Sequence, residues 1–308
     1  MTAIPLRHSA LGALDGAPVW LNSGPLTADA LRGRVVLVNF WTYSCVNWLR
    51  TLPYVSAWAE RYRDRGLTVV GAHAPEFGFE HDLDNVRRAT RELGVGYPVV
   101  IDNEFAIWRS FGNRYWPAAY LVDRDGRVRF RHFGEGAYEE IERAIQELLG
   151  VDEQTVDVDA GGLAEAADWD TLGSPETYVG AARVERRGGR SPDELALNEW
   201  TLAGEWSLGE EAAVLAAPGG SIAYRFRARD LNLVLAPAES GASVPFTVRL
   251  DGEPPEDDHG LDAGADGEGT VSEPRMYQLV RQHGPVAERT FEIAFAETGV
   301  RAYVFTFG

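Results

Sequence analysis

The sequence contains a single cysteine, Cys45, and no lysine among its 308 residues. One thiol cannot form an intramolecular disulfide, so structural disulfides and an internal dithiol switch are excluded. The absence of lysine likewise excludes chemistry at a lysine amine, such as Schiff-base formation. No apolar run approaches the roughly 20 residues that span a bilayer, and the N-terminus lacks the pattern of a secretory signal. We therefore expect a soluble, cytoplasmic protein without membrane insertion.

Positive charge is also scarce. The formal net charge is -18, and it is concentrated in the second half of the chain. Residues 1–150 hold 18 acids and 17 arginines, whereas residues 151–308 hold 29 acids and 12 arginines. A surface this acidic repels the phosphate backbone of nucleic acids, so we expect no nucleic-acid partner. The length and a hydrophobic content of 45% predict two domains with packed cores.

The first half has the pattern of a compact α/β domain. Three apolar, β-rich runs are typical of buried strands: 35–40, 67–73 and 97–102. Three stretches have the spacing of amphipathic helices, the second with Asp82 as a candidate cap: 46–65, 81–94 and 138–150. Residues 117–133 predict a β-hairpin, because Asp125-Gly126 supplies the turn. Parallel β-α-β units followed by a hairpin and a helix form a compact α/β domain.

The second half changes character. Residues 151–174 are acidic and rich in small residues, which predicts a linker. Beyond it, short runs alternate polar and apolar residues with period two, which predicts an antiparallel β-sandwich over 175–308. The acidic stretch 251–270 is the longest expected unstructured loop. Its carboxylates are ligands that calcium takes, but the spacing fits no EF-hand and such charge runs are usually solvated.

Cys45 stands at a position that favours reactivity. It follows a predicted strand and opens a predicted helix, where unpaired N–H groups and the helix dipole lower a thiol pKa. About 70 residues later, Pro117 opens the strand of the hairpin after Trp116, a position suited to a cis peptide bond. A lone cysteine is otherwise most often an inert apolar group.

Several segments together resemble a known family. VVLVNFWTYSCVNWLRTLPY, VVGAHAPEFGFE and NRYWPAAYLVDRDGRVRFRHFGEG resemble the thioredoxin-like domain of the TlpA/redoxin superfamily. The order of motifs is most similar to DipZ-type proteins, in which a carbohydrate-binding-module-like sandwich follows, and SPETYVG, LAGEW and RAYVFTFG resemble that second domain. The resemblance implies a thioredoxin-like α/β fold over 1–150, the linker 151–174, and a jelly-roll or galactose-binding-like sandwich over 175–308.

The chain departs from that family at two positions. Family members carry Cys-x-x-Cys, whereas the matching stretch here is Cys45-Val46-Asn47-Trp48, so the resolving thiol is missing. Many thioredoxins hold a buried acid six residues before the attacking cysteine, and Asn39 stands there. The resemblance implies that Cys45 is the catalytic residue. The residues expected to line the substrate groove are Trp41, Thr42, Trp48, Trp116 and Pro117, and the possible supporting residues are Asn39, His73, Glu76 and Arg114.

Three functions are compatible with these residues. The first is a monothiol oxidoreductase, in which Cys45 attacks a disulfide-containing or thiol-modified protein or a small-thiol substrate, and a low-molecular-weight thiol reductant resolves the product. The second is a catalytically inactive thioredoxin-fold binding or scaffold protein. The third is a one-cysteine peroxidase, because Thr42-x-x-Cys45 matches the peroxiredoxin core and an arginine could support the thiolate: Arg109, Arg114 or Arg127. Val38, however, stands where those enzymes place a proline.

Other candidate sites give weaker signals. His73 and Glu76 are more simply interpreted as a strand-end histidine and a solvated loop acid. The six histidines show no metal-ligand spacing with Cys45, and glycine-rich nucleotide motifs are absent, so we expect no metal and no cofactor. Sandwich aromatics could stack on a sugar, but they are more often core residues: Tyr178, Trp200 and Trp206. Formation of a homo-oligomer through the sandwich is a role for this domain that the sequence favours at least as much as sugar binding.

Overall fold

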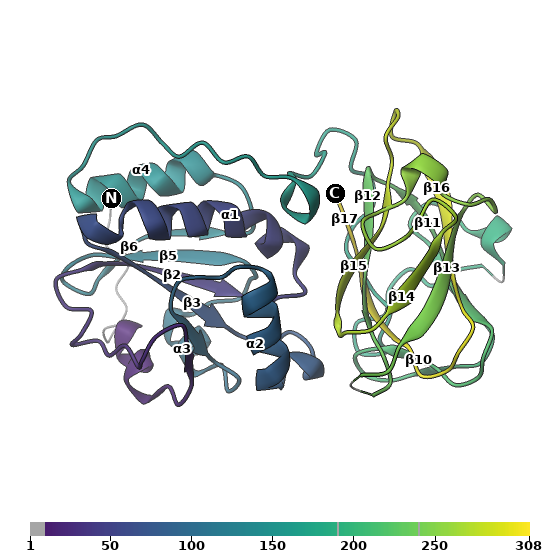
Figure 1. Ribbon diagram of the computed structural model, residues 1–308, viewed down its shortest axis with the longest axis horizontal. Helices are drawn as coiled ribbons and strands as arrows, with labels where there is room; N and C mark the ends of the chain where they lie inside the picture. Colours follow the sequence, from purple (N-terminus) through teal and green to yellow (C-terminus); the bar gives the residue numbers. More distant parts are fainter. Residues whose placement is uncertain (1–9, 190, 240) are drawn as a thin grey trace. The chain divides into compact units, whose positions relative to one another are not determined.

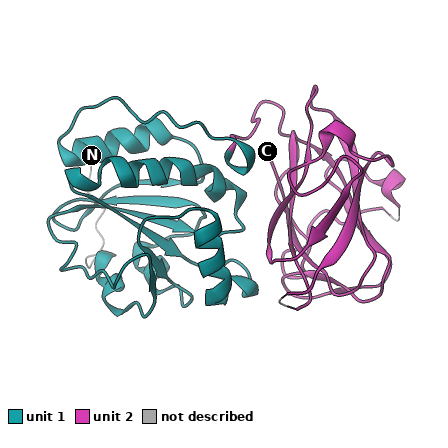
Figure 2. Cartoon of the chain, viewed as in Figure 1, with its two compact units in different colours: residues 1–164 teal, residues 165–308 magenta. Residues whose placement is uncertain are grey.

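The computed structural model describes residues 10–189, 191–239 and 241–308 (Figure 1). Two compact units make up the chain (Figure 2): unit 1 ends at Ala164, and unit 2 is Glu165–Gly308. The division falls within the segment 151–174 that the sequence predicts as a linker. Within the described ranges, every helix is too short or too polar to cross a bilayer.

Unit 1 is built on a six-stranded sheet. Its strands, in spatial order, are β1 (Trp20–Leu21), β4 (Val99–Ile101), β3 (Leu67–His73), β2 (Val35–Trp41), β5 (Ala118–Val122) and β6 (Val128–Phe133). The three central strands β4, β3 and β2 run parallel, whereas β1, β5 and β6 pair antiparallel with their neighbours. The predicted β-α-β units and the β5–β6 hairpin are therefore confirmed, as is the thioredoxin-like α/β fold.

Helices cover both faces of this sheet. They are α1 (Val46–Arg61), α2 (Leu83–Glu92), α3 (Ala106–Phe111) and α4 (Tyr138–Leu149), with 3-10 turns at Ala10–Gly16, Arg63–Arg65, Gly78–His81 and Gly162–Ala164. Figure 1 shows α1 and α4 above the sheet and α3 below it. Strand β2 is buried along its whole length, as expected of a central strand covered on both faces. Val36, Val38 and Phe40 alternate toward the core that includes Ile107 of α3.

The observed boundaries follow local chemistry. Helix α2 begins after Asp82, whose carboxylate accepts a hydrogen bond from the Asp84 N–H at 2.8 Å, so the predicted cap is confirmed. Helix α1 stops at Arg61, four residues before the predicted end, and Gly66 then turns the chain at φ +104°. The pattern did not reveal α3, because a helix of six residues spans fewer than two turns.

Unit 2 consists of two antiparallel sheets that enclose one apolar core. The first contains β15 (Arg275–Arg281), β12 (Asp230–Ala236), β17 (Arg301–Phe307), β10 (Ala213–Leu215) and β9 (Trp206–Leu208), with β7 (Thr177–Tyr178) beside β17. The second contains β14 (Glu268–Val271), β13 (Val244–Leu250), β16 (Glu288–Phe295), β11 (Gly220–Arg227) and β8 (Trp200–Ala203). Two 3-10 turns, Pro192–Glu194 and Glu256–Asp258, complete the unit. The predicted all-β sandwich is confirmed, with Tyr224, Phe291 and Phe305 in its core.

Two acidic segments are more ordered than the sequence suggests. In the predicted linker, the Val156 N–H donates to both oxygens of Glu142 on α4, at 2.9 and 3.0 Å. In the stretch 251–270, Asp262 pairs with Arg275 at 2.6 Å, and other carboxylates pair with Arg289. The expectation of an unstructured loop at 251–270 is wrong, because arginines of the neighbouring strands neutralise and anchor its acids.

Candidate functional site

Cys45 lies where β2 gives way to α1. It is the N-cap residue of α1, with an extended backbone at φ -81° and ψ 113°. The thiol is half-buried, and it donates to the main-chain carbonyl of Trp116 at 3.8 Å. The first N–H groups of a helix have no partner within the helix, so an anion at this end of the 16-residue α1 is favoured. The helix N-terminus therefore favours a thiolate, whereas the Trp116 carbonyl favours the protonated thiol that donates to it.

Trp116 and Pro117 form the opposite side of the thiol's surroundings. The bond between them is cis, and the Trp116 indole N–H donates to the Ala74 carbonyl at 2.9 Å. Trp116 is half-buried and Pro117 is buried. Arg114 is exposed in the same loop, and next to it Tyr115 is 53% exposed, with its ring on Phe133. This loop, residues 113–117, is hereafter the Trp116 loop.

Three of the predicted groove residues, Trp41, Thr42 and Trp48, are fully buried. Trp48 stacks on Trp41 with ring centroids 4.2 Å apart, and its indole N–H donates to the Asn39 side-chain oxygen at 3.0 Å. The first turn of α1 points Trp48 at β2, because that face of the helix packs on the sheet. The two departures from the family pattern thus meet as one hydrogen-bonded pair in the core.

Gly71 makes room for the stacked indoles. A Cβ atom there would lie 2.9 Å from the Trp41 indole nitrogen and 2.9 Å from the Tyr97 ring. Real Cβ atoms do not approach so closely, so a side chain at this position would displace Trp41 or Tyr97.

His73 and Glu76 have structural surroundings. His73 ends β3 and is fully buried, edge-on to Trp41 at 4.9 Å and stacked against Tyr43 at 5.9 Å. Burial, together with the nearby His81, lowers the pKa of His73 to about 3, so its ring is neutral at physiological pH. Glu76 is half-buried, and its main-chain N–H donates to Glu80.

Glu80 is the residue that the sequence did not reveal. It is fully buried, and its Oε1 accepts a 2.6 Å hydrogen bond from the Ser44 hydroxyl. Its Oε2 accepts from the main-chain N–H groups of Glu76 and Phe77, at 2.6 and 3.0 Å. Burial raises the pKa of Glu80 to about 7, although the hydroxyls of Ser44 and Thr42 oppose the shift. In the sequence Glu80 looks like an ordinary acid of a loop, so no sequence signal distinguished it from solvated acids.

These contacts join three loops at one end of the central strands of unit 1, where β2 and β3 finish and β5 begins. Glu80 links the Cys45 loop (residues 42–45) to the segment 74–80. The indole of Trp116 links segment 74–80 to the Trp116 loop, and the thiol of Cys45 links the Trp116 loop back to the Cys45 loop. The site is therefore a closed ring of three contacts around one thiol.

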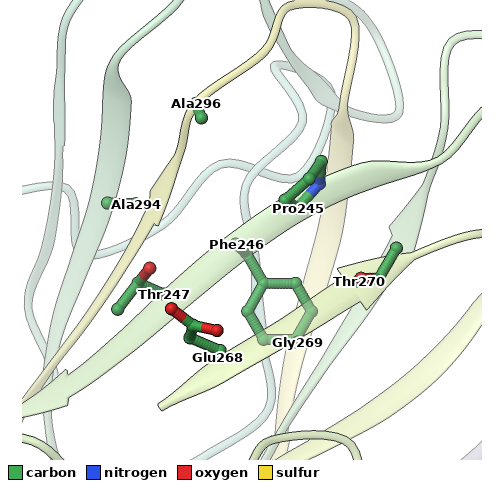
Figure 3. A pocket seen from close by; sticks show the side chains of 8 residues that line it. All are labelled: Pro245, Phe246, Thr247, Glu268, Gly269, Thr270, Ala294 and Ala296. Atoms are coloured by element: carbon green, nitrogen blue, oxygen red, sulfur yellow. The ribbon is translucent and has the colours of Figure 1, made fainter. Parts of the chain in front are cut away.

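Unit 2 offers a cavity of different character. Figure 3 shows side chains at an open cavity of about 350 Å³, lined by Pro245, Phe246, Thr247, Glu268, Gly269, Thr270, Ala294 and Ala296. One carboxylate and two hydroxyls are its side-chain polar groups. Trp200 is fully buried in the sandwich core, which removes it as a sugar-stacking residue, and Trp206 packs edge-on against Phe295.

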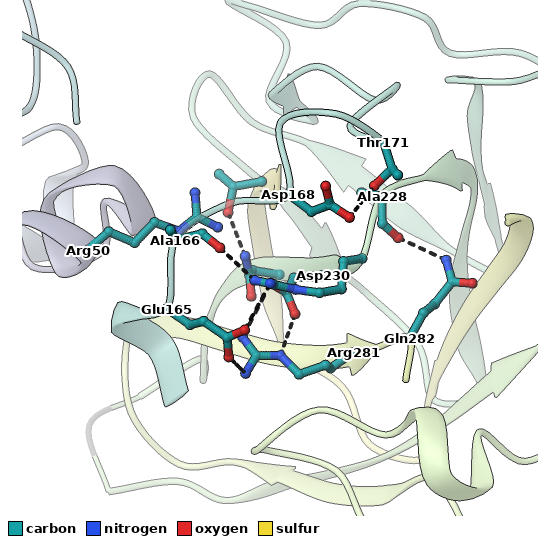
Figure 4. A network of polar contacts seen from close by, with 12 residues as sticks. Arg50, Glu165, Ala166, Asp168, Thr171, Ala228, Asp230, Arg281 and Gln282 are labelled. Atoms are coloured by element: carbon teal, nitrogen blue, oxygen red, sulfur yellow. Dashed lines mark hydrogen bonds and ion pairs between the residues drawn. The ribbon is translucent and has the colours of Figure 1, made fainter. Parts of the chain in front are cut away.

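A charge network lies elsewhere in unit 2 (Figure 4). Asp230 is 1% exposed and pairs with Arg229 at 2.7 Å and with Arg281 at 2.6 Å. Both arginines also bind Glu165, at 2.9 and 2.7 Å, so the start of the unit is tied to β12 and β15. The two arginines balance the two carboxylates of the network, as expected of a structural anchor. Over the described ranges, His, Cys, Asp and Glu side chains form no cluster that could hold a metal ion.

Comparisons with known proteins agree with this arrangement. Residues 20–131 match the AhpC/TSA family, and residues 174–308 match the thioredoxin like C-terminal domain. Together these matches account for most of both units.

Individual relatives extend the likeness. Protein DipZ of Mycobacterium bovis is 36% identical over 257 residues, which cover 78% of this chain and 36% of DipZ, so the chain spans about a third of the length of that relative. The thiol-disulfide oxidoreductase YkuV of Bacillus subtilis is 29% identical over 44% of this chain and 91% of its own. A solved thiol-disulfide isomerase from Corynebacterium glutamicum is 22% identical over 45% of this chain and all of its own, with a TM-score of 0.39. The chain thus combines an AhpC/TSA-type domain with a thioredoxin like C-terminal domain, is similar to DipZ over most of its own length, and has a single cysteine.

Proposed function

We propose that this chain is a thiol-disulfide oxidoreductase that acts through Cys45 alone. The supporting observation is the position of the thiol, half-buried at the N-cap of α1 and against the Trp116 carbonyl. Trp48, which replaces the resolving cysteine, is a fully buried core residue bonded to Asn39. An intermediate formed at Cys45 must therefore be resolved by a thiol from another molecule.

The proposed reaction has two exchange steps. In the first, the Cys45 thiolate attacks one sulfur of a substrate disulfide, a mixed disulfide forms, and the other substrate sulfur leaves as a thiolate. In the second, an external thiolate attacks the substrate sulfur of the mixed disulfide, a new disulfide forms between the substrate and the external thiol, and Cys45 leaves as the thiolate. One cycle therefore releases one substrate thiol and regenerates Cys45. A second external thiol that attacks the new disulfide releases the other substrate thiol and leaves the two external thiols joined as a disulfide. The N-terminus of α1 favours the anionic sulfur at the start and end of the cycle.

The surroundings favour a disulfide carried on a peptide segment or on a small thiol compound. Tyr115 of the Trp116 loop is an exposed aromatic residue that packs on the exposed Phe133, and Arg114 of the same loop adds a positive charge. A low-molecular-weight thiol is the proposed reductant. In this scheme residues 1–150 carry the chemistry, residues 151–174 connect, and the sandwich of residues 175–308 binds a partner or a second copy of the chain.

The test is the formation of a mixed disulfide. The native protein is incubated with glutathione disulfide, and intact mass is measured before and after a small thiol is added. The proposal requires one added glutathione per chain, which the small thiol removes. Cys45→Ser is the control and must gain no mass. The pH dependence of iodoacetamide alkylation is measured beside it, and a thiol pKa below the usual ~8.5 is expected.

The two alternative functions give different results in the same experiment. An unreactive Cys45, with no mixed disulfide at any pH in a folded protein, favours a binding or scaffold role and contradicts the proposal. Rapid oxidation of Cys45 to a sulfenic acid by hydrogen peroxide, with slow exchange on disulfides, favours a one-cysteine peroxidase. In that case the AhpC/TSA match would reflect chemistry as well as fold.

A further inference from the structure

We propose that Glu80 is the positioning residue of the Cys45 thiol, and that its buried carboxyl, bonded to the residue before Cys45, governs how readily that thiol ionises. The inference rests on the proposed function, in which Cys45 is the reacting group. It assigns to the segment 74–80 a role in the reaction that involves no contact with the substrate. The site then has one reacting sulfur and one buried carboxyl that governs it.

The geometry supplies the first argument. One carboxyl group accepts three hydrogen bonds from two different segments, namely from Ser44 in the Cys45 loop and from Glu76 and Phe77 in segment 74–80. Ser44 directly precedes Cys45 and is itself 2% exposed. The carboxyl therefore fixes the main chain from which the thiol projects. Removing this acceptor leaves the buried donors of Ser44 and Phe77 unsatisfied, so the loop must shift.

The same carboxyl cannot serve the role of the usual buried acid of thioredoxins. That position is Asn39, which is bonded to Trp48 on the other side of the stacked indoles. A resolving thiol, whose proton such an acid would manage, is absent from the chain. Glu80 reaches the site from a different segment, after β3, and it contacts the loop through Ser44. Its influence is therefore on the position and charge environment of the attacking sulfur.

Charge supplies the second argument. The carboxyl is fully buried, and the charged side chain that acts on it is another acid, Glu76, which disfavours its ionisation further. The other titratable groups on the segments packed against it are Tyr43, Cys45, His73 and His81. When Glu80 ionises, a buried negative charge is bonded to Ser44, the residue before Cys45, and a like charge disfavours the thiolate. Thiolate formation at Cys45 and ionisation of Glu80 are therefore coupled.

The experiment measures the rate of Cys45 alkylation by iodoacetamide from pH 5 to 10 in the full chain. The wild-type profile is expected to show two inflections, one near pH 7 from Glu80 and a later one from the thiol. Glu80→Gln is expected to lose the inflection near 7 and to react roughly threefold to tenfold faster at pH 8, because the opposing charge is gone. A Glu80→Gln profile identical to wild type in a folded protein overturns the proposal.

Ser44→Ala provides a second test that keeps the charge. The Ser44 hydroxyl lowers the pKa of Glu80, so its removal is expected to move the inflection near 7 to higher pH without abolishing it. This shift also serves if Glu80→Gln does not fold, and an unmoved inflection contradicts the proposal. Glu142→Gln is the matched control, because Glu142 is a buried acid bonded to Tyr62 and Trp58 on the α1–α4 side. Its profile must equal that of wild type.

These results separate the inference from the proposed function. Alkylation requires only a nucleophilic thiol, so it reports on Glu80 even if Cys45 exchanges with no disulfide. A changed profile together with no mixed disulfide would keep Glu80 as the positioning residue and reject the oxidoreductase. An unchanged profile together with efficient mixed-disulfide formation would do the reverse.

Discussion

Buried carboxyl groups occur in both units, but their partners differ in kind. Glu80 of unit 1 accepts hydrogen bonds from a hydroxyl and two main-chain N–H groups, and its charged neighbour is another acid. Asp230 of unit 2 is equally buried but lies between Arg229 and Arg281. A buried acid paired with guanidinium groups stays charged and stabilises its surroundings only while both partners remain. A buried acid with neutral donors can instead change its charge within the physiological range.

The comparison separates a structural acid from a functional candidate. Burial alone does not distinguish Glu80 from Asp230, since both are almost without solvent contact. What distinguishes them is whether the surrounding groups compensate the charge. In unit 1 the hydrogen-bond donors to Glu80 are neutral, and one of them, Ser44, directly precedes Cys45. Strong perturbation next to a reactive group is the pattern expected of functional sites.

The largest expected effect concerns His73, a second fully buried titratable group of unit 1. Its pKa is lowered to about 3 by burial, whereas the unfolded chain binds the proton near 6.5. The free energy of unfolding should therefore fall as pH drops from 6.5 to 3, by about 5 kcal/mol from this group alone. His73→Phe removes the titration and keeps an aromatic ring beside Trp41 and Tyr43. Urea unfolding of both proteins across this range measures the difference, and parallel curves would contradict the assigned burial.

The next effect tests the compensated acid. Asp230→Asn leaves two positive charges, Arg229 and Arg281, facing the single carboxylate of Glu165 in a mostly buried site, and we expect a loss of about 3–5 kcal/mol in the free energy of unfolding. The measurement is urea unfolding at pH 7. Glu165 remains bonded to both arginines in the variant, so some binding of the segment at Glu165–Ala166 should persist. A loss below about 1 kcal/mol would show that the pair is not a stabilising element.

A third prediction concerns Glu80 and has the opposite dependence on pH. The folded pKa of about 7 lies above the reference value of 4.5, so the folded state binds a proton more tightly than the unfolded state. The stabilisation by this proton is complete below pH 4.5 and is lost as the pH rises to 7, amounting to about 3 kcal/mol. Glu80→Gln lacks this dependence. The gap between the two unfolding curves should therefore open between these pH values, and a constant gap would contradict an ionisation of Glu80 in this range.

Sequence patterns predicted those parts of the molecule that depend on local spacing. Strand β2, helix α1, the Asp82 cap and the place of Cys45 all follow from residues close together in the chain. Each period, 2.0 or 3.6, is a local property of the backbone. The sandwich was predicted for the same reason, from alternation within single strands such as β13.

Two features of the site could not be obtained in this way. Ser44 and Glu80 are 36 positions apart, and nothing in either segment records that the fold brings them together. Acids in polar loops are mostly solvated, so Glu80 was not singled out. Trp48 was placed at the groove because the family's second cysteine stands there, whereas the direction of its side chain depends on how α1 packs against β2. Both features depend on tertiary contacts, which spacing along the chain does not contain.

The smallest expected effect tests whether burial or ion pairing determines how much a carboxylate contributes to the free energy of unfolding. Glu288 pairs with Arg225 on neighbouring strands of unit 2, but both side chains are nearly 40% exposed. Water already screens this pair, so Glu288→Gln should cost about 0–1 kcal/mol at pH 7, and less at high salt. Urea unfolding at two salt concentrations, beside Asp230→Asn, measures the contrast within one sandwich. Should both variants lose the same free energy, pairing alone would explain the role of Asp230, and the low exposure that sets Glu80 and Asp230 apart from surface acids would no longer matter.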